Sequence, residues 1–130
     1  MKVIIAGGRE FGDYKFLCKV CDHKLKNQEE IEIVCGKAPG ADTLGEDYAK
    51  ERGYKILPFP ADWNDMSEPC VRKKRRDGSE YNALAGHKRN QKMADIADAL
   101  IVFWDGKSTG SADMIKRATK KGIKIKIYNY

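Results

Sequence analysis

The 130-residue sequence has no apolar run near the roughly 20 residues that a membrane-spanning helix needs. The apolar residues 3–6 are too few for the core of a signal peptide, and glycines follow them. We therefore expect a cytoplasmic protein without membrane contact. Hydrophobic residues make up 42% of the chain and charged residues 34%, as in soluble globular proteins. A chain of this length predicts one domain, residues 1–130.

Cysteine is scarce, and the four cysteines lack the pattern of a metal site. Cys18 and Cys21 have CxxC spacing, but no second CxxC or HxxxH pair completes a set of four zinc ligands. Apolar residues around them recur every three or four positions, as on one face of a helix: Tyr14, Leu17, Cys18, Cys21 and Leu25. We predict that both cysteines lie in the core, with no metal and no cofactor.

The net charge of +6 is concentrated in one segment, the basic run Arg72, Lys73, Lys74, Arg75 and Arg76. Without these five, the 25 basic side chains fall to 20, against 19 acidic ones. Such a run is typical of a solvated, mobile loop. The alternative is a loop that contacts a polyanion such as nucleic acid. The sequence leaves both interpretations open.

Hydrophobic periodicity predicts alternating strands and helices. The expected strands are residues 2–6, 31–35, 54–59, 99–104 and 123–128. The expected helices are residues 13–26, 41–52, 79–97 and 108–121. Residues 61–79 show no periodicity and are expected to form one long, partly mobile basic loop. The alternation predicts a doubly wound, Rossmann-like α/β domain: a five-stranded, mainly parallel sheet in the order 3-2-1-4-5, with helices on both faces.

Two standard phosphate-binding motifs are missing, namely GxGxxG and GxxxxGK[ST]. Three glycine-bearing turns nevertheless follow predicted strands, at residues 7–9, 36–40 and 105–110. In the expected fold they meet at one edge of the sheet and lead to helix N-termini, which attract anions. Glycine leaves the backbone N–H groups open to a phosphate. The three turns together predict a site for a phosphate-bearing ligand.

Polar residues at this edge have alternative roles. Arg9 either binds a phosphate or carboxylate or pairs with Glu10 or Asp13. Asp42 either contacts a ribose or satisfies the N-terminus of its helix. Trp63 either stacks on a base or fills part of the core.

Five segments match, in order, the motifs of one family: residues 4–11 (IIAGGREF), 35–42 (CGKAPGAD), 59–63 (FPADW), 86–93 (GHKRNQKM) and 104–111 (WDGKSTGS). On these segments the chain resembles the YspA-like, cpYpsA-related branch of the SLOG superfamily. The resemblance implies a Rossmann-like domain that binds a nucleotide or nucleotide-derived molecule, as a sensor, sequestering or processing protein. It also implies a phage or bacterial setting and a homodimer or higher homo-oligomer.

The resemblance assigns ligand contacts to the glycine turns and to the segment 86–93, and Trp63 joins them as the residue placed to stack on a base. The expected ligand-binding residues are Gly7, Gly8, Arg9, Gly36, Gly40, Asp42, Trp63, Arg89, Asn90, Ser108, Thr109, Gly110 and Ser111. We expect residues 108–111 to hold the phosphate, because Gly110 permits close approach and the three hydroxyls donate hydrogen bonds.

LOG-type enzymes of the superfamily cleave the N-glycosidic bond of nucleoside monophosphates and carry a PGGxGTxxE motif. Here Met114 stands at the glutamate position, and a helix turns the neighbouring Asp113 about 100° away. The departure favours binding without turnover. One alternative is an enzyme acting on a nucleotide, with Asp42, Asp62 or Asp113 as the catalytic group. The other is a DprA-like binder of single-stranded nucleic acid that uses the basic run and Trp63.

Overall fold

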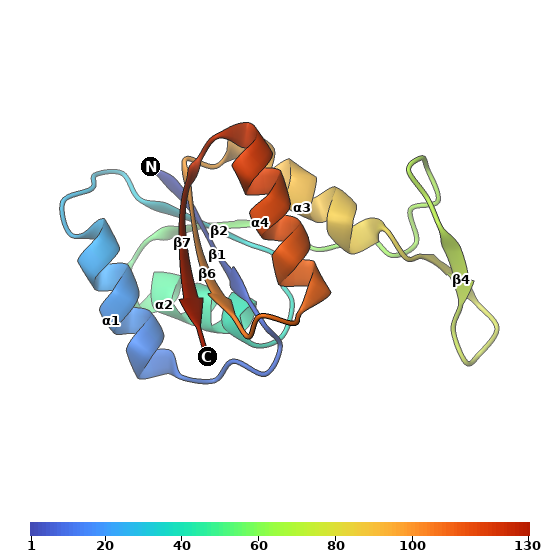
Figure 1. The fold of residues 1–130 in the computed structure, drawn as a ribbon, viewed down its shortest axis with the longest axis horizontal. Coiled ribbons are helices and arrows are strands. Elements are labelled where there is room, and N and C mark those ends of the chain that lie inside the picture. The colour runs from blue at the N-terminus through green and yellow to red at the C-terminus, as the bar shows by residue number, and fades with distance from the viewer.

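The computed structural model describes all residues 1–130 and has the expected α/β architecture (Figure 1). Five parallel strands form one sheet in the order β3-β2-β1-β6-β7. Their bounds are Lys55–Pro58 (β3), Glu32–Cys35 (β2), Lys2–Gly7 (β1), Ala99–Trp104 (β6) and Lys124–Asn129 (β7). The predicted fold class and strand order are confirmed, with the first strand central and the last strand at an edge.

Four helices cover the two faces of this sheet. Helices α1 (Tyr14–Leu25) and α2 (Ala41–Arg52) share one cluster of buried apolar side chains with the sheet. Helices α3 (Ala85–Ile96) and α4 (Thr109–Lys121) share the other (Figure 1). The chain leaves β1 toward the first face and β6 toward the second, so the switch point between the faces lies between these two neighbouring strands. No helix combines the length and the hydropathy that crossing a membrane requires.

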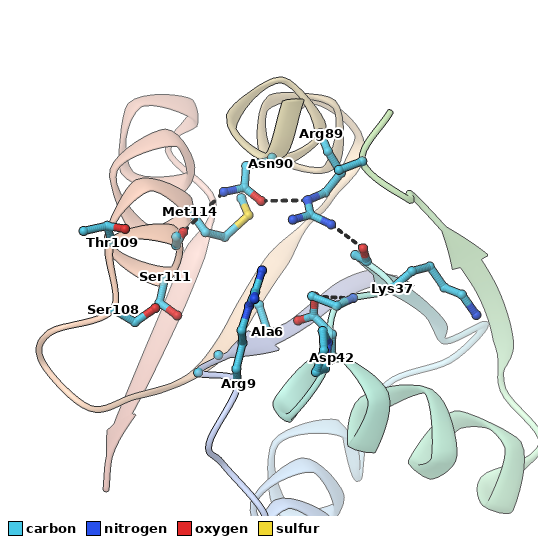
Figure 2. Close-up of a pocket in the computed structure, with 18 of the residues that line it drawn as sticks. Ala6, Arg9, Lys37, Asp42, Arg89, Asn90, Ser108, Thr109, Ser111 and Met114 are labelled. Carbon is cyan, nitrogen blue, oxygen red and sulfur yellow. Dashed lines mark hydrogen bonds between the residues drawn. The ribbon is translucent and has the colours of Figure 1, made fainter. Parts of the chain in front are cut away.

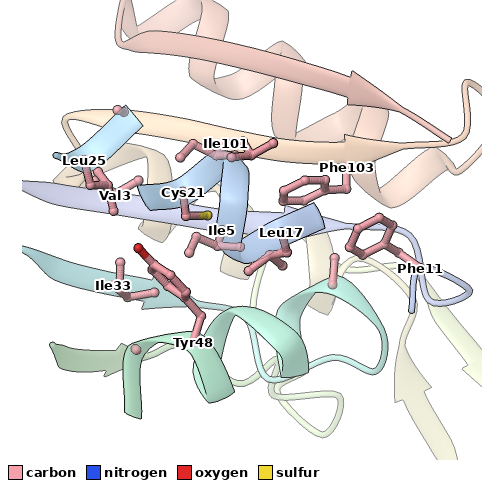
Figure 3. Close-up of a cluster of buried hydrophobic side chains, with 14 residues drawn as sticks. Val3, Ile5, Phe11, Leu17, Cys21, Leu25, Ile33, Tyr48, Ile101 and Phe103 are labelled. Carbon is pink, nitrogen blue, oxygen red and sulfur yellow. The ribbon is translucent and has the colours of Figure 1, made fainter. Parts of the chain in front are cut away.

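The cluster under α1 and α2 runs along the sheet from Val3 and Leu25 to Phe11 and Phe103, so it reaches the end where the strands finish (Figure 3). The Phe103 ring, at the end of β6, stacks on Phe11 with 4.6 Å between ring centroids. Cys21 is fully buried in this cluster, and the partly buried Cys18 packs against it. The predicted core position is therefore confirmed for Cys21 and holds in part for Cys18.

Three of the four helices begin and end close to the predicted positions. Asp13 caps α1, because its Oδ1 accepts the N–H of Phe16 at 3.1 Å. Helices α2 and α4 end at Gly53 and Gly122, both with φ of +74°, a left-handed conformation that glycine adopts without strain.

The prediction for residues 61–97 needs correction. Helix α3 begins at Ala85 and not at Ser79. The strands β4 (Arg72–Lys74) and β5 (Glu80–Asn82) pair in antiparallel fashion. The first three residues of the basic run therefore form one arm of a hairpin, and Arg75 and Arg76 lie in the connection between the strands, where a loop without secondary structure was predicted. We call residues 71–83 the basic hairpin; it projects from the body of the molecule (Figure 1).

Ser79 belongs to the tip of this hairpin. Its N–H and its hydroxyl both donate to Oδ1 of Asp77, at 2.9 and 2.6 Å. Ser79 therefore stabilises a turn. Serine is common both in turns and at helix N-termini, which is why the sequence predicted a helix start here. Mobility of the hairpin remains a prediction.

Asn82 explains why the chain forms a hairpin here. It is fully buried, and its Oδ1 accepts the N–H groups of Val71 (3.1 Å) and Leu84 (2.9 Å). Its Nδ2 donates to the carbonyls of Asp65 (3.0 Å) and Pro69 (3.2 Å). A single buried amide therefore joins both arms of the hairpin base and delays the start of α3.

Candidate ligand-binding site

A cavity of about 610 Å³ opens where β1, β2 and β6 end, at the switch point of the sheet (Figure 2). This is the usual place and size for a small-molecule site in such folds. All but one of the predicted ligand contacts line it: Gly7, Gly8, Arg9, Gly36, Asp42, Trp63, Arg89, Asn90, Ser108, Thr109, Gly110 and Ser111. The exception is Gly40.

Gly40 supports the cavity wall from behind. It has φ of +79°, and a Cβ at this position would overlap the carbonyl oxygen of Gly8. The next residue, Ala41, donates its N–H to that same oxygen at 3.2 Å. The turn after β2 is therefore held against the turn after β1, with glycine required at the contact.

Arg89 and Asn90, neighbours on α3, connect three parts of the wall. Arg89 Nη1 donates to the carbonyl of Gly36, and its Nε donates to Asn90 Oδ1 at 3.1 Å. Asn90 Nδ2 reaches the carbonyl of Gly110 at 3.3 Å. A Cβ on Gly36 would lie only 2.7 Å from Arg89 Nη1 and 2.8 Å from Asp42 Oδ2. The absence of a side chain at Gly36 therefore allows the Arg89 guanidinium group to lie against the turn after β2.

Asp42 is a buried carboxyl group in the first turn of α2, only 7% exposed. Its Oδ2 accepts the N–H of Ala38 at 3.3 Å, so it is held by the preceding turn and caps no helix. Burial raises the pKa of Asp42 to about 6, and the positive charge of Arg89 limits the rise.

Arg9 extends from the end of β1 into the cavity, between the start of α4 and Asp42 (Figure 2). It forms no ion pair and no side-chain hydrogen bond, so the alternative of a pair with Glu10 or Asp13 is not realised. Burial lowers the pKa of Arg89, and the nearby charge of Arg9 adds to the effect. Two arginines therefore line one cavity, an arrangement that an anion would stabilise.

The start of α4 closes the opposite side. Asp105 Oδ1 accepts the N–H groups of Lys107 and Ser108, each at 2.8 Å, which shapes the turn after β6. No side chain caps α4, and the N–H groups of residues 109–111 have no acceptor in the protein. These groups and the partial positive charge of the helix end are available to an anion.

Comparison with known proteins identifies the family. The model of the YspA, cpYpsA-related SLOG family matches residues 1–65, half of the chain. The chain belongs to this SLOG family. The match contains the turns after β1 and β2 and reaches Trp63, so it covers one wall of the cavity. Comparison with curated protein sequences gave no match.

Two solved structures share the fold of this SLOG protein. DNA processing protein A (DprA) from Streptococcus pneumoniae is 23% identical, with a TM-score of 0.71 over 97% of this chain and 49% of its own. DprA from Helicobacter pylori, which binds single-stranded DNA, is 20% identical, with a TM-score of 0.70 over 98% of this chain and 64% of its own. The chain thus spans about half to two thirds of the length of these proteins.

Two of the three carboxylates weighed as catalytic groups, Asp62 and Asp113, do not line the cavity of this SLOG protein. Asp113 faces Arg117, whose Nε donates to its Oδ2 at 2.8 Å. Met114 lines the cavity at the glutamate position and is only 1% exposed. Of the three candidates, only Asp42 lines the cavity.

Sequence reasoning missed several cavity residues of the SLOG protein, notably Lys37, His87 and Tyr130. Tyr130 follows the far edge strand, yet its hydroxyl lies where a Cβ on Gly8 would be. Burial raises the pKa of Tyr130, as do the nearby carboxylates of Asp105 and Glu10. Gly8 follows β1 and Tyr130 follows β7, and these strands are not adjacent in the sheet. The contact is therefore visible in the structure but has no signal in the sequence.

Proposed function

We propose that the cavity binds a nucleotide or nucleotide-derived molecule through its phosphate. The proposal rests on the convergence of Arg9 with the uncapped first turn of α4. Arg9 has no acidic partner, and the N–H groups of residues 109–111 have no acceptor. Charge-assisted hydrogen bonds from a guanidinium and from a helix N-terminus are among the strongest available to a phosphate.

The remaining lining residues suit the rest of a nucleotide. The Asp42 carboxyl group, ionised for the most part at neutral pH, is an acceptor for ribose hydroxyls. The Trp63 ring, 38% exposed, offers a stacking surface for a base. A volume of about 610 Å³ is of the order that a mononucleotide fills.

Binding without hydrolysis fits these residues better than an enzyme does. The apolar Met114 occupies the position of the LOG-type glutamate, and Asp113 is engaged by Arg117. The proposal for this SLOG protein therefore includes a sensor or sequestering role in the cytoplasm. Residues 72–76 do not line the cavity, so the nucleic-acid alternative concerns a different surface.

The ligand class is testable by native mass spectrometry of the purified protein, followed by calorimetric titration with nucleoside monophosphates, ribose 5-phosphate and inorganic phosphate. We expect phosphate-bearing compounds to bind and the matching nucleosides to bind at least about tenfold more weakly, since a charge-assisted contact is lost. Equal affinity for nucleoside and nucleotide contradicts the proposal.

Gly110→Asp tests the position of the phosphate. A Cβ at Gly110 meets no atom within 4 Å, and an acidic side chain near a helix N-terminus stabilises the helix. The fold should therefore survive while phosphate binding is lost. Gly12→Asp is the matched control, because Gly12 also has free space and lies outside the cavity. If Gly110→Asp binds as tightly as Gly12→Asp, the phosphate lies elsewhere.

A further inference from the structure

The basic hairpin holds positive charge that the fold does not use. Its thirteen residues include the five cations of the basic run and two carboxylates, Asp77 and Glu80, for a net charge of +3. Only Arg72 forms an ion pair, with Glu80 at 3.1 Å. Lys73, Lys74 and Arg76 are exposed and have no acidic partner within the protein. Their mutual repulsion is therefore relieved only by solvent or by a bound anion.

Aromatic rings accompany these cations on one face of the hairpin. Lys73 pairs with Tyr81 across the strands, so both side chains point to the same side. The Arg75 guanidinium lies 5.2 Å from the centre of the Tyr81 ring. Trp63 meets the same ring edge-on, with 6.3 Å between ring centroids. Trp63 also lines the cavity, so this face runs from the hairpin to the cavity mouth.

We propose that the face formed by Trp63, Lys73, Arg75 and Tyr81 binds single-stranded nucleic acid. Cations that follow the phosphates and rings that stack on unpaired bases are the two components of such surfaces. A duplex does not suit the face, because paired bases are not open to stacking. A lipid surface does not suit it either, since Val71 is the one large aliphatic side chain that the hairpin exposes.

The proposal goes beyond the phosphate site, since it uses only Trp63 from the cavity lining. The body of the molecule supports it by its charge: outside the basic run the chain is almost neutral, so attraction for a polyanion is focused on the hairpin. A strand bound there would have its bases directed along the Tyr81 and Trp63 rings toward the cavity mouth.

Fluorescence anisotropy with a labelled oligothymidylate of about 20 nucleotides tests the proposal. The variant Lys73→Gln/Lys74→Gln removes two unpaired cations from the hairpin. Lys19→Gln/Lys120→Gln removes two exposed lysines without ion pairs from α1 and α4, with the same change in net charge. We expect the hairpin variant to bind at least about tenfold more weakly at low salt. Lys73 lies on the proposed face and Lys74, the next residue of β4, points to the other side, so the log–log salt slope should be shallower by about 0.7, the contribution of one phosphate contact. The control pair should keep the parent affinity.

Stacking is tested separately by Tyr81→Leu, which keeps an apolar side chain on β5 and is expected to weaken binding of the single strand about tenfold. Arg9→Gln is expected to keep strand binding while losing phosphate ligands, so the two proposals fail independently. The inference would be overturned by equal losses in the two lysine pairs, by equal affinity for a duplex of the same length, or by unchanged binding in Tyr81→Leu. Tighter binding to anionic vesicles or to an acidic peptide than to the oligonucleotide would do the same. Melting curves verify that each variant is folded.

Discussion

The sheet and the basic hairpin hold their side chains in opposite ways. Around β1 and β6, apolar side chains are fully buried and the cavity polar groups are tied by hydrogen bonds, as Arg89 and Asn90 are. In the hairpin, residues 71–80 are all exposed, and the interstrand bonds and the base at Asn82 carry the structure. A substitution of a buried side chain in the body should therefore change folding, whereas one among the exposed residues 71–80 of the hairpin should change binding alone.

The largest effect on stability is expected from Phe103→Ala. Phe103 is fully buried and packs against Phe11 and Tyr128, with ring centroids 4.6 and 5.7 Å away. The loss of this ring and the resulting cavity should lower the free energy of unfolding by about 3–5 kcal/mol. Urea denaturation measures this change in the free energy of unfolding. Ile127→Ala, at a side chain 43% exposed on β7, is the control and should stay within about 0.5 kcal/mol. Similar losses in both variants would refute the contrast between core and edge.

The second effect depends on pH and concerns Asp42. Because the pKa of Asp42 rises from 3.8 to about 6 on folding, the folded state binds more protons between these values. The contribution of Asp42 to stability therefore falls as pH rises from about 4 to 6. Asp42→Asn removes this titration and keeps an acceptor for the Ala38 N–H.

Relative to the parent, Asp42→Asn should gain about 2–3 kcal/mol of stability between pH 4 and pH 7. Urea denaturation of both proteins at the two pH values checks the sign, since contributions from all other groups cancel in the difference. A difference that does not change with pH would mean that the carboxyl group titrates normally in the fold.

The third effect separates the two cysteines of α1. Cys21 is fully buried, whereas Cys18 is partly exposed. The double alanine variant should lose about 1–3 kcal/mol of stability, most of it from Cys21. Single variants compared by thermal melting test this division. A larger loss from Cys18→Ala than from Cys21→Ala would show that the helix packs on its other side.

The body was predictable from sequence because burial leaves a pattern. The strands β1 and β6 are continuous apolar runs. Gly53 and Gly122 indicate helix ends, because glycine adopts the left-handed conformation that terminates a helix. The glycine turns of the cavity followed from the rule that parallel strands finish at one edge, whereas Arg89 and Asn90, on α3, were expected from the family resemblance. Each of these signals is local in the chain.

The hairpin carried no such signal. Its strands are exposed, so no alternation of apolar and polar residues marks them. Its anchor is the buried amide of Asn82, a residue type common in surface turns. The contacts of Tyr130 with Gly8 and of Arg89 with Gly36 join residues far apart in the chain. Such positions depend on packing and cannot be read from periodicity.

The smallest effect on folding is expected from deletion of residues 72–76. Residues 72–81 join Val71 to Asn82, so the deletion shortens a ten-residue connection to five. Halving a loop changes its closure entropy by only about 0.6 kcal/mol, and no core side chain is removed. The melting temperature should shift by less than about 5 °C.

Asn82→Ala is the comparison: it leaves the N–H groups of Val71 and Leu84 without their acceptor and should cost about 1–3 kcal/mol. A deletion as destabilising as Asn82→Ala would mean that the exposed arm packs on the body or on a second copy of the chain, and the division between a stabilising body and a binding hairpin would fail.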